Sequence, residues 1–418
     1  MDALKIRGGK PLSGVVEISG AKNACLPIMA ATLLAPGKHQ MTNVPELADV
    51  KTMGQLLRGL GAEVSNTGQH ALTVHTDKLT SVEAPYDLVR TMRASVLVLG
   101  PLLAREGRCR VSLPGGCAIG ARPIDQHLKG LVALGAEIEL DHGYVDAKVK
   151  QLRGAEFTFD MVTVTGTENV LMAAVRARGE TVLRNCALEP EIDDLVKTLR
   201  GMGAKIEGDG TAVLRVQGVD GLMPMQHAVM RDRIEAGTFA AAAAMCRGDV
   251  LLLGAELAHF GAVADRMRDA GVTLTQKDKG VRVFAPTRLR AVDIKTAPFP
   301  AFATDMQAQF MAMMCVADGS SIISETVFEN RYMHVPELQR LGANLTVVDG
   351  SVIVRGQDKL MGATVMATDL RASASLVLAG LAATGETMIR RIYHLDRGYE
   401  AIERKLGDLG ADIERVKE

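Results

Sequence analysis

The sequence of 418 residues contains no tryptophan, and its aromatic residues are limited to five tyrosines and nine phenylalanines. It therefore has few side chains on which nucleobases could stack. It also lacks an excess of charge, because 48 lysines and arginines balance 49 aspartates and glutamates. A net charge of −1 gives no electrostatic footprint for nucleic acid or an anionic membrane. We expect a protein that binds neither.

Long hydrophobic runs are absent as well. The most apolar stretches, residues 240–246 and 376–383, are too short to cross a bilayer as a helix. Residues 1–8 contain no apolar core of a secretory signal peptide. From both absences we expect a cytoplasmic protein.

Cysteine and histidine are sparse and scattered. The six cysteines form no C-x-x-C pair, and the nine histidines show no H-x-x-x-H spacing. Most cysteines stand in apolar segments, where reduced and buried thiols are typical. The sequence therefore predicts no metal centre, and we expect no cofactor.

The sequence repeats itself with a period of about seventy residues, which indicates duplication of a small α/β unit. The marker is a glycine followed by Ala or Val, placed where a helix ends, at Gly61, Gly135, Gly203, Gly271, Gly342 and Gly410. Each unit reads as βαβαββ, with a first helix of small apolar residues and an amphipathic second helix. The small-residue helices should be buried. We expect an α/β fold in which six units form two domains of three.

Basic residues recur where the first helix of a unit begins. Lys22, Arg93, Arg231 and Arg371 occupy matching positions, and helix N-termini attract anions. If the two domains face each other, their helix ends predict a cationic cleft for a ligand with phosphates or carboxylates. Each residue singly could instead be a solvated surface charge.

A purely structural role is considered for three further residues. Thr304 and Asp305 open the first helix of the fifth unit and could serve as helix caps only. Asp49 matches no repeated position, and we expect a structural role for it.

The stretch Leu113–Pro123 predicts a loop, because three glycines and two prolines exclude regular structure. It contains Cys117, with Arg122 five residues further on. An arginine near a thiol favours the thiolate and attracts anions. A surface turn with an incidental cysteine is the alternative for an isolated thiol.

These segments together resemble the UDP-N-acetylglucosamine enolpyruvyl transferases, which belong to the EPSP synthase superfamily. The similarity runs from end to end of the chain, through Ser19–Asn23, Thr91–Ser95, Leu113–Pro123, Thr304–Phe310, Glu329–Pro336, Ala367–Ser373 and Asp396–Glu400. It implies an inside-out α/β barrel in two domains, 22–229 and 1–21 with 230–418, and an active site in the cleft between them.

The resemblance also implies the reaction, which is the transfer of an enolpyruvyl group from phosphoenolpyruvate to the 3′-hydroxyl of UDP-N-acetylglucosamine. In this family the reaction begins peptidoglycan synthesis. Cys117 would be the proton donor, would form an adduct with phosphoenolpyruvate and would be alkylated by fosfomycin. A thiol with a reference pKa of about 8.5 suits a donor that stays protonated near neutral pH. Asp305 would accept the proton of the sugar hydroxyl.

The remaining site residues are likewise carried over from the resemblance. Those expected at phosphoenolpyruvate are Lys22, Asn23, Arg122 and Arg397. Those expected at UDP-N-acetylglucosamine and the cationic wall are Arg93, Asp305, Val327, Arg331 and Arg371.

One stretch departs from the family pattern. Some members have Ser-Val-Gly where this chain has Thr163-Val-Thr165, so no site residue is carried over from Thr163–Asn169.

Two other functions remain as alternatives. One is enolpyruvyl transfer to shikimate 3-phosphate, whose enzymes have an Asn-Ala-Gly-Thr signature where this chain has Thr91–Ser95. The other is a non-catalytic sugar-nucleotide sensor. The sequence predicts no oligomeric state.

Overall fold

The computed structural model describes residues 2–113 and 124–417. Helices and strands alternate throughout these residues, which confirms the α/β class predicted from the sequence. Within the described part, no helix combines the length and the apolar character that crossing a membrane requires.

The described residues divide into two compact units. The Lys22 unit comprises residues 20–113 and 124–230. The Asp305 unit comprises residues 2–19 and 231–417. Each unit has a hydrophobic core of its own, and each is described separately below.

The Lys22 unit contains twelve strands among its described residues. Its helices are α1 (Lys22–Ala31), η1 (Thr32–Leu34), α2 (Ala48–Gly59), α3 (Tyr86–Val89), η2 (Arg93–Val98), α4 (Leu99–Glu106), α5 (Asp125–Ala133), α6 (Val164–Ala174) and α7 (Pro190–Gly201). Its strands are β3 (Lys38–Thr42), β4 (Glu63–Gly68), β5 (Ala71–His75), β6 (Glu83–Ala84), β7 (Arg108–Ser112), β8 (Glu137–Asp141), β9 (Tyr144–Lys148), β10 (Glu156–Thr158), β11 (Glu180–Arg184), β12 (Lys205–Glu207), β13 (Val213–Gln217) and β14 (Gln226–Ala228).

The Asp305 unit is built in the same way. Its helices are α8 (Arg233–Met245), η3 (Leu257–Phe260), α9 (Ala262–Asp269), η4 (Thr304–Met306), α10 (Gln307–Cys315), α11 (Val335–Arg340), α12 (Leu370–Ala382), η5 (Ile392–Arg397) and α13 (Ile402–Asp408). Its strands are β1 (Asp2–Arg7), β2 (Ser13–Glu17), β15 (Asp249–Leu253), β16 (Thr273–Lys277), β17 (Gly280–Phe284), β18 (Ile294–Lys295), β19 (Ser320–Ser324), β20 (Asn344–Val348), β21 (Ser351–Arg355), β22 (Leu360–Met361), β23 (Thr364–Met366), β24 (Ala383–Thr384), β25 (Glu386–Arg390) and β26 (Asp412–Lys417).

Six four-stranded sheets share one topology, which confirms the predicted βαβαββ repeat. Their orders are β14-β3-β5-β4, β6-β7-β9-β8, β10-β11-β13-β12, β2-β15-β17-β16, β18-β19-β21-β20 and β23-β25-β1-β26. In each sheet the first two strands are parallel and the other pairings are antiparallel. Strands β14, β2 and β1 complete repeats whose other strands lie far away in the sequence.

The repeated glycines act as predicted, because each stands two residues after the last residue of the second helix of its repeat (α2, α5, α7, α9, α11 or α13). There the backbone has a positive φ, between 88° and 105°, at Gly61, Gly135, Gly203, Gly271, Gly342 and Gly410. Only glycine adopts this left-handed conformation without a steric cost, so the helix stops and the chain turns into the next strand.

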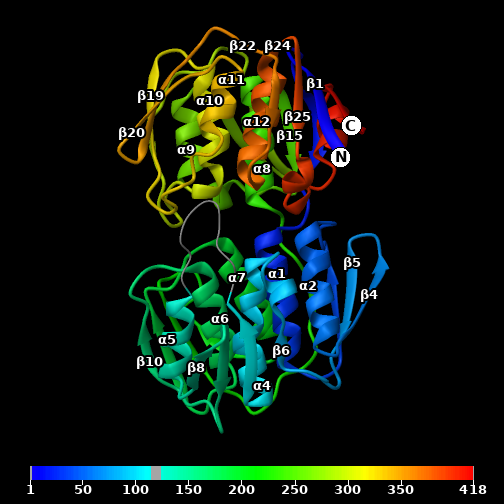
Figure 1. Cartoon of the computed structure of the whole chain (residues 1–418), viewed down its shortest axis with the longest axis vertical. Helices are drawn as coiled ribbons and strands as arrows, with labels where there is room; N and C mark the ends of the chain where they lie inside the picture. The colour runs from blue at the N-terminus through cyan, green and yellow to red at the C-terminus, as the bar shows by residue number, and fades with distance from the viewer. Residues whose placement is uncertain (1, 114–123, 418) are drawn as a thin grey trace. The chain divides into compact units, whose positions relative to one another are not determined.

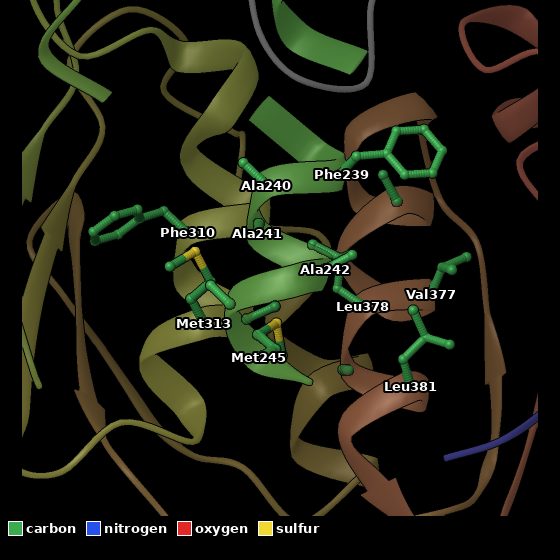
Figure 2. Close-up of a cluster of buried hydrophobic side chains, with 14 of the residues drawn as sticks. Phe239, Ala240, Ala241, Ala242, Met245, Phe310, Met313, Val377, Leu378 and Leu381 are labelled. Carbon is green, nitrogen blue, oxygen red and sulfur yellow. The ribbon is translucent and has the colours of Figure 1, made fainter. Parts of the chain in front are cut away.

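Helices α8, α10 and α12 form the centre of the Asp305 unit and pack against one another (Figure 1). The run Ala240–Ala244 on α8 is at most 1% exposed, as its small side chains predicted. Figure 2 shows Met313 of α10 and Leu378 of α12 beside this helix, whereas Phe310 of α10 points away from it. Small side chains let the helices approach closely.

Candidate active site

Asp305 lies at the start of one of these buried helices and is paired with two arginines. Its Oδ1 accepts a hydrogen bond of 2.8 Å from Nη2 of Arg331, and its Oδ2 accepts one of 2.8 Å from Nη2 of Arg371. Ala303 and Met306, rather than Thr304 or Asp305, stand at the N-cap positions of η4 and α10. Thr304 donates to Glu325 and Asp305 accepts from two arginines, so the interpretation of these two residues as helix caps only was wrong. The Asp305 side chain is 25% exposed, whereas the two arginines are nearly buried.

Arg371 is fixed at both its backbone and its side chain. Asp369 caps α12 by accepting a hydrogen bond of 2.9 Å from the backbone N–H of Arg371. A second side-chain nitrogen, Nη1, donates to the hydroxyl of Tyr399 at 3.2 Å, and that hydroxyl also lies 2.8 Å from Oγ1 of Thr238. Burial, the largest single cause, acts to lower the pKa of Arg371, but the charges of Asp305, Tyr399 and Asp232 and the hydrogen bond to Asp305 together raise this pKa.

Arg331 is fixed by a separate set of groups. Its Nη1 donates to Oγ1 of Thr304 at 2.9 Å, and its guanidinium lies 5.5 Å from the ring centre of Phe328. The backbone N–H of Val327 donates to Oε1 of Glu325 at 2.8 Å. The structure thus brings the predicted residues Asp305, Arg331 and Val327 into one connected region of the Asp305 unit, together with Arg371.

Arg397 is the last residue of η5, a helix that packs against α12 in the same unit. Its charge acts with burial, the larger cause, to lower the pKa of His394. Both residues are half-buried.

In the Lys22 unit, Lys22 and Asn23 are the first two residues of α1, whose start also has no side-chain cap. Nζ of Lys22 lies 3.5 Å from Oδ2 of Asp49, and both side chains are largely buried. No motif in the sequence links Asp49 to this lysine, because Asp49 stands on α2, 27 residues away.

Arg93 begins η2 and lies near His127. The ring of His127 contacts two residues of the stretch Thr163–Asn169. Nδ2 of Asn169 is 2.9 Å from Nδ1 of His127, and Oγ1 of Thr165 is 3.2 Å from its Nε2. Burial lowers the pKa of His127 to about 4, and the charge of Arg93 adds to this effect. The ring is therefore neutral at physiological pH.

Cys117 and Arg122 lie outside the described residues. The five other cysteines are buried, and burial raises the pKa of each thiol, as at Cys186 to about 11 and at Cys109, Cys246 and Cys315 to about 12, with Cys25 also raised. Buried thiols with a raised pKa are poor nucleophiles. The reactive role of Cys117 stays a prediction.

Among residues 2–113 and 124–417, no three His, Cys, Asp or Glu side chains are grouped in a way that could hold a metal ion. The groups that are present can bind anions through guanidinium and ammonium donors, and can accept a proton at Asp305.

Comparison with known proteins agrees with this chemistry. A family model described as EPSP synthase (3-phosphoshikimate 1-carboxyvinyltransferase) matches residues 6–406. The solved enolpyruvyl transferase NikO from Streptomyces tendae has a TM-score of 0.89 and 28% identity, with 99% of each chain covered. The fold is thus that of an enolpyruvyl transferase.

Two curated relatives narrow the assignment. The UDP-N-acetylglucosamine 1-carboxyvinyltransferase of Geobacter metallireducens is 59% identical over 418 residues, and that of Trichlorobacter lovleyi is 60% identical over 419 residues, with all of each chain covered. The chain therefore belongs to the EPSP synthase family and, within it, to the UDP-N-acetylglucosamine 1-carboxyvinyltransferases.

Sequence reasoning missed the residues that position the two arginines. Thr304 accepts from Arg331 and Tyr399 accepts from Arg371, and Glu325 in turn accepts from Thr304. Two signals were available, because Thr304 adjoins Asp305 and Tyr399 stands in the quoted motif Asp396–Glu400. Nothing in the sequence marked Glu325.

Proposed function

We propose that this chain transfers the enolpyruvyl group of phosphoenolpyruvate to the 3′-hydroxyl of UDP-N-acetylglucosamine and releases phosphate. The observation that carries the proposal is the carboxylate of Asp305, held between Arg331 and Arg371 at a helix start. The full-length identity of 59% to an enzyme with this name supports the substrate pair. The enzyme would act in the cytoplasm, at the first step of peptidoglycan synthesis.

The reaction requires an acid and a base, and the two groups exchange these roles between the addition and the elimination. In the addition, the sugar oxygen bonds to C2 of phosphoenolpyruvate, its proton passes to a base, and an acid protonates the methylene carbon. In the elimination, the C–O bond to phosphate breaks and a proton leaves the new methyl group. We assign Asp305 as the base at the sugar hydroxyl and Cys117 as the acid at the methylene carbon.

The substrates carry several negative charges, which the basic residues would neutralise. Lys22, Arg122 and Arg397 would bind the phosphate and carboxylate of phosphoenolpyruvate, and Asn23 would hydrogen-bond its reacting centre. In the same proposal, the sugar nucleotide is bound by the backbone of Val327 and by a cationic wall of Arg93, Arg331 and Arg371. The domain carrying Cys117 would be 22–229, and the domain carrying Asp305 would be 1–21 with 230–418.

The first experiment measures phosphate release from phosphoenolpyruvate with UDP-N-acetylglucosamine or shikimate 3-phosphate as acceptor. We expect release with the sugar nucleotide alone. Release with shikimate 3-phosphate alone would identify the other transferase. Absence of release with either acceptor, despite sugar-nucleotide binding, would favour a sensor.

Two variants connect the reaction to the assigned residues. Asp305→Asn should retain sugar-nucleotide binding and lose turnover, because an amide cannot accept the proton. Asp249→Asn is the matched control, since Asp249 also accepts two hydrogen bonds from guanidinium nitrogens, but both come from Arg282 and lie on the surface of the same unit. Equal activity of both variants would contradict the role of Asp305.

A further inference from the structure

Glu325 follows strand β19 directly and is a buried carboxylate with a full set of hydrogen-bond donors around it. The side chain is 7% exposed. Its Oε1 accepts from Oγ1 of Thr296 at 2.7 Å, and from the backbone N–H groups of Val327 at 2.8 Å and Phe328 at 3.1 Å. Its Oε2 accepts from Oγ1 of Thr304 at 2.8 Å. One oxygen thus holds residues Val327 and Phe328, called the Val327 segment below, and the other oxygen reaches the start of η4.

The bond to Thr304 continues to Asp305. A hydroxyl has one proton, and Thr304 donates it to Glu325, so the hydroxyl oxygen faces Arg331 as an acceptor. This direction is required, because a guanidinium has donors only. Arg331 then donates to Asp305. The order of donors is therefore fixed along the whole path from Asp305 back to Glu325.

We propose that Glu325 is a positioning residue that fixes the Val327 segment and the Arg331–Asp305 pair relative to each other. The inference rests on the proposed function, in which Asp305 is the base and Val327 contacts the sugar nucleotide. Glu325 itself touches no reacting atom. It acts by setting the distance and the angle at which the carboxylate of Asp305 meets the sugar hydroxyl, a geometry to which proton transfer is sensitive.

The conservative variant Glu325→Gln separates the two functions of this side chain. Three donors point at Oε1, so the amide oxygen takes that place and the amide nitrogen faces Thr304. The Val327 segment stays held, but Thr304 now receives donors from both the amide and Arg331 and loses the acceptor for its own proton. The path to Asp305 is disturbed while the segment is not.

The experiment measures phosphate release at varied UDP-N-acetylglucosamine concentration, with thermal unfolding of every variant. For Glu325→Gln we expect kcat to fall by about 10- to 100-fold, because small displacements of reacting groups have effects of this size. The KM for the sugar nucleotide should change by less than about threefold, since uniform binding is retained. Glu337→Gln is the matched control: Glu337 also accepts a backbone N–H, that of Met366 at 2.8 Å, but has no bond to Thr304.

Variants of Thr304 test the path if Glu325→Gln folds poorly. Thr304→Val should lower kcat as Glu325→Gln does, and Thr304→Ser should restore it by restoring the hydroxyl. The double variant with Glu325→Gln should be no slower than either single variant, since both remove the same path. Three outcomes would overturn the inference. They are a double variant whose loss of kcat is the product of the two single losses, an unchanged kcat in Glu325→Gln or Thr304→Val, and a kcat of Thr304→Ser as low as that of Thr304→Val. An inactive wild-type chain would instead refute the proposed function.

Discussion

Protonation of His127 should weaken the fold below neutral pH, with a size that follows from its surroundings. Oδ1 of Asn169 accepts from the N–H of Gly100 at 2.6 Å, so Nδ2 of Asn169 must donate to Nδ1 of His127. The ring proton therefore sits on Nε2, directed at Oγ1 of Thr165. A second proton would put two donors against each other in a buried site.

The sign and magnitude follow from linkage. Burial, and then the charge of Arg93, lower the pKa of His127 from 6.5 to about 4 in the folded state. As the pH falls, the unfolded chain takes up the proton first, so stability is full above pH 6.5 and is lost toward pH 4. At 1.36 kcal/mol per pKa unit the full loss is about 3 kcal/mol, of which about 2 kcal/mol is lost by pH 5.

Two measurements test this prediction, and His127→Gln serves both. In carbon–proton spectra of ring-labelled histidine, the signal absent from the variant should titrate near pH 4, and Arg93→Gln should move it upward. In urea unfolding, the free energy of unfolding of the variant should fall by about 2 kcal/mol less than that of the wild type between pH 7 and pH 5. His334, whose pKa burial also lowers to about 4, is present in both proteins and cancels. A titration near pH 6.5, or equal losses, would refute the reasoning.

Three further predictions concern Arg371, Glu168 and Cys117. Arg371→Met should lower the free energy of unfolding by about 3 kcal/mol, because Asp305 loses a buried partner, and a loss below about 1 kcal/mol in urea unfolding would contradict this. Burial, and then Glu191, raise the pKa of Glu168, so its folding contribution falls as pH rises above 4.5. Glu168→Gln should therefore melt above the wild type at pH 8 but not at pH 4, and an equal gap at both pH values would count against the shift. Fosfomycin should add once to the intact chain and not to Cys117→Ala; an adduct in that variant would exclude Cys117.

Much of the fold could be predicted because the signals that define it are local. A glycine two residues beyond a helix, such as Gly203 after α7, is required by the backbone conformation at that residue. The small side chains of Ala240–Ala244 likewise show directly that α8 can be approached closely from all sides. Repetition of such local signals was enough to give the six units and the α/β class.

The side-chain network of the site could be predicted only in part, because its partners are distant in sequence. Asp305 and Arg371 lie 66 residues apart, and Thr238 and Tyr399 lie 161 apart. For Thr304 the sequence indicated a local cap, which is the commonest use of such a residue. The structure gives it a partner 21 residues away at Glu325 instead, since the fold brings the end of β19 to the start of η4.

The concentration of charged residues at helix starts follows from the core itself. Helices α8, α10 and α12 are buried along almost their whole length, so a charged side chain can be tolerated only at an end. There Asp232 and Asp369 each accept two backbone N–H groups, which satisfies the unpaired donors of α8 and α12. The start of α10 lacks such a cap, and its acidic residue, Asp305, is bonded to two arginines instead. Among these three helices, α10 is thus the one at whose start arginine side chains, rather than an N-cap, orient the carboxylate. A base can be held at this position without removing the cap of a helix.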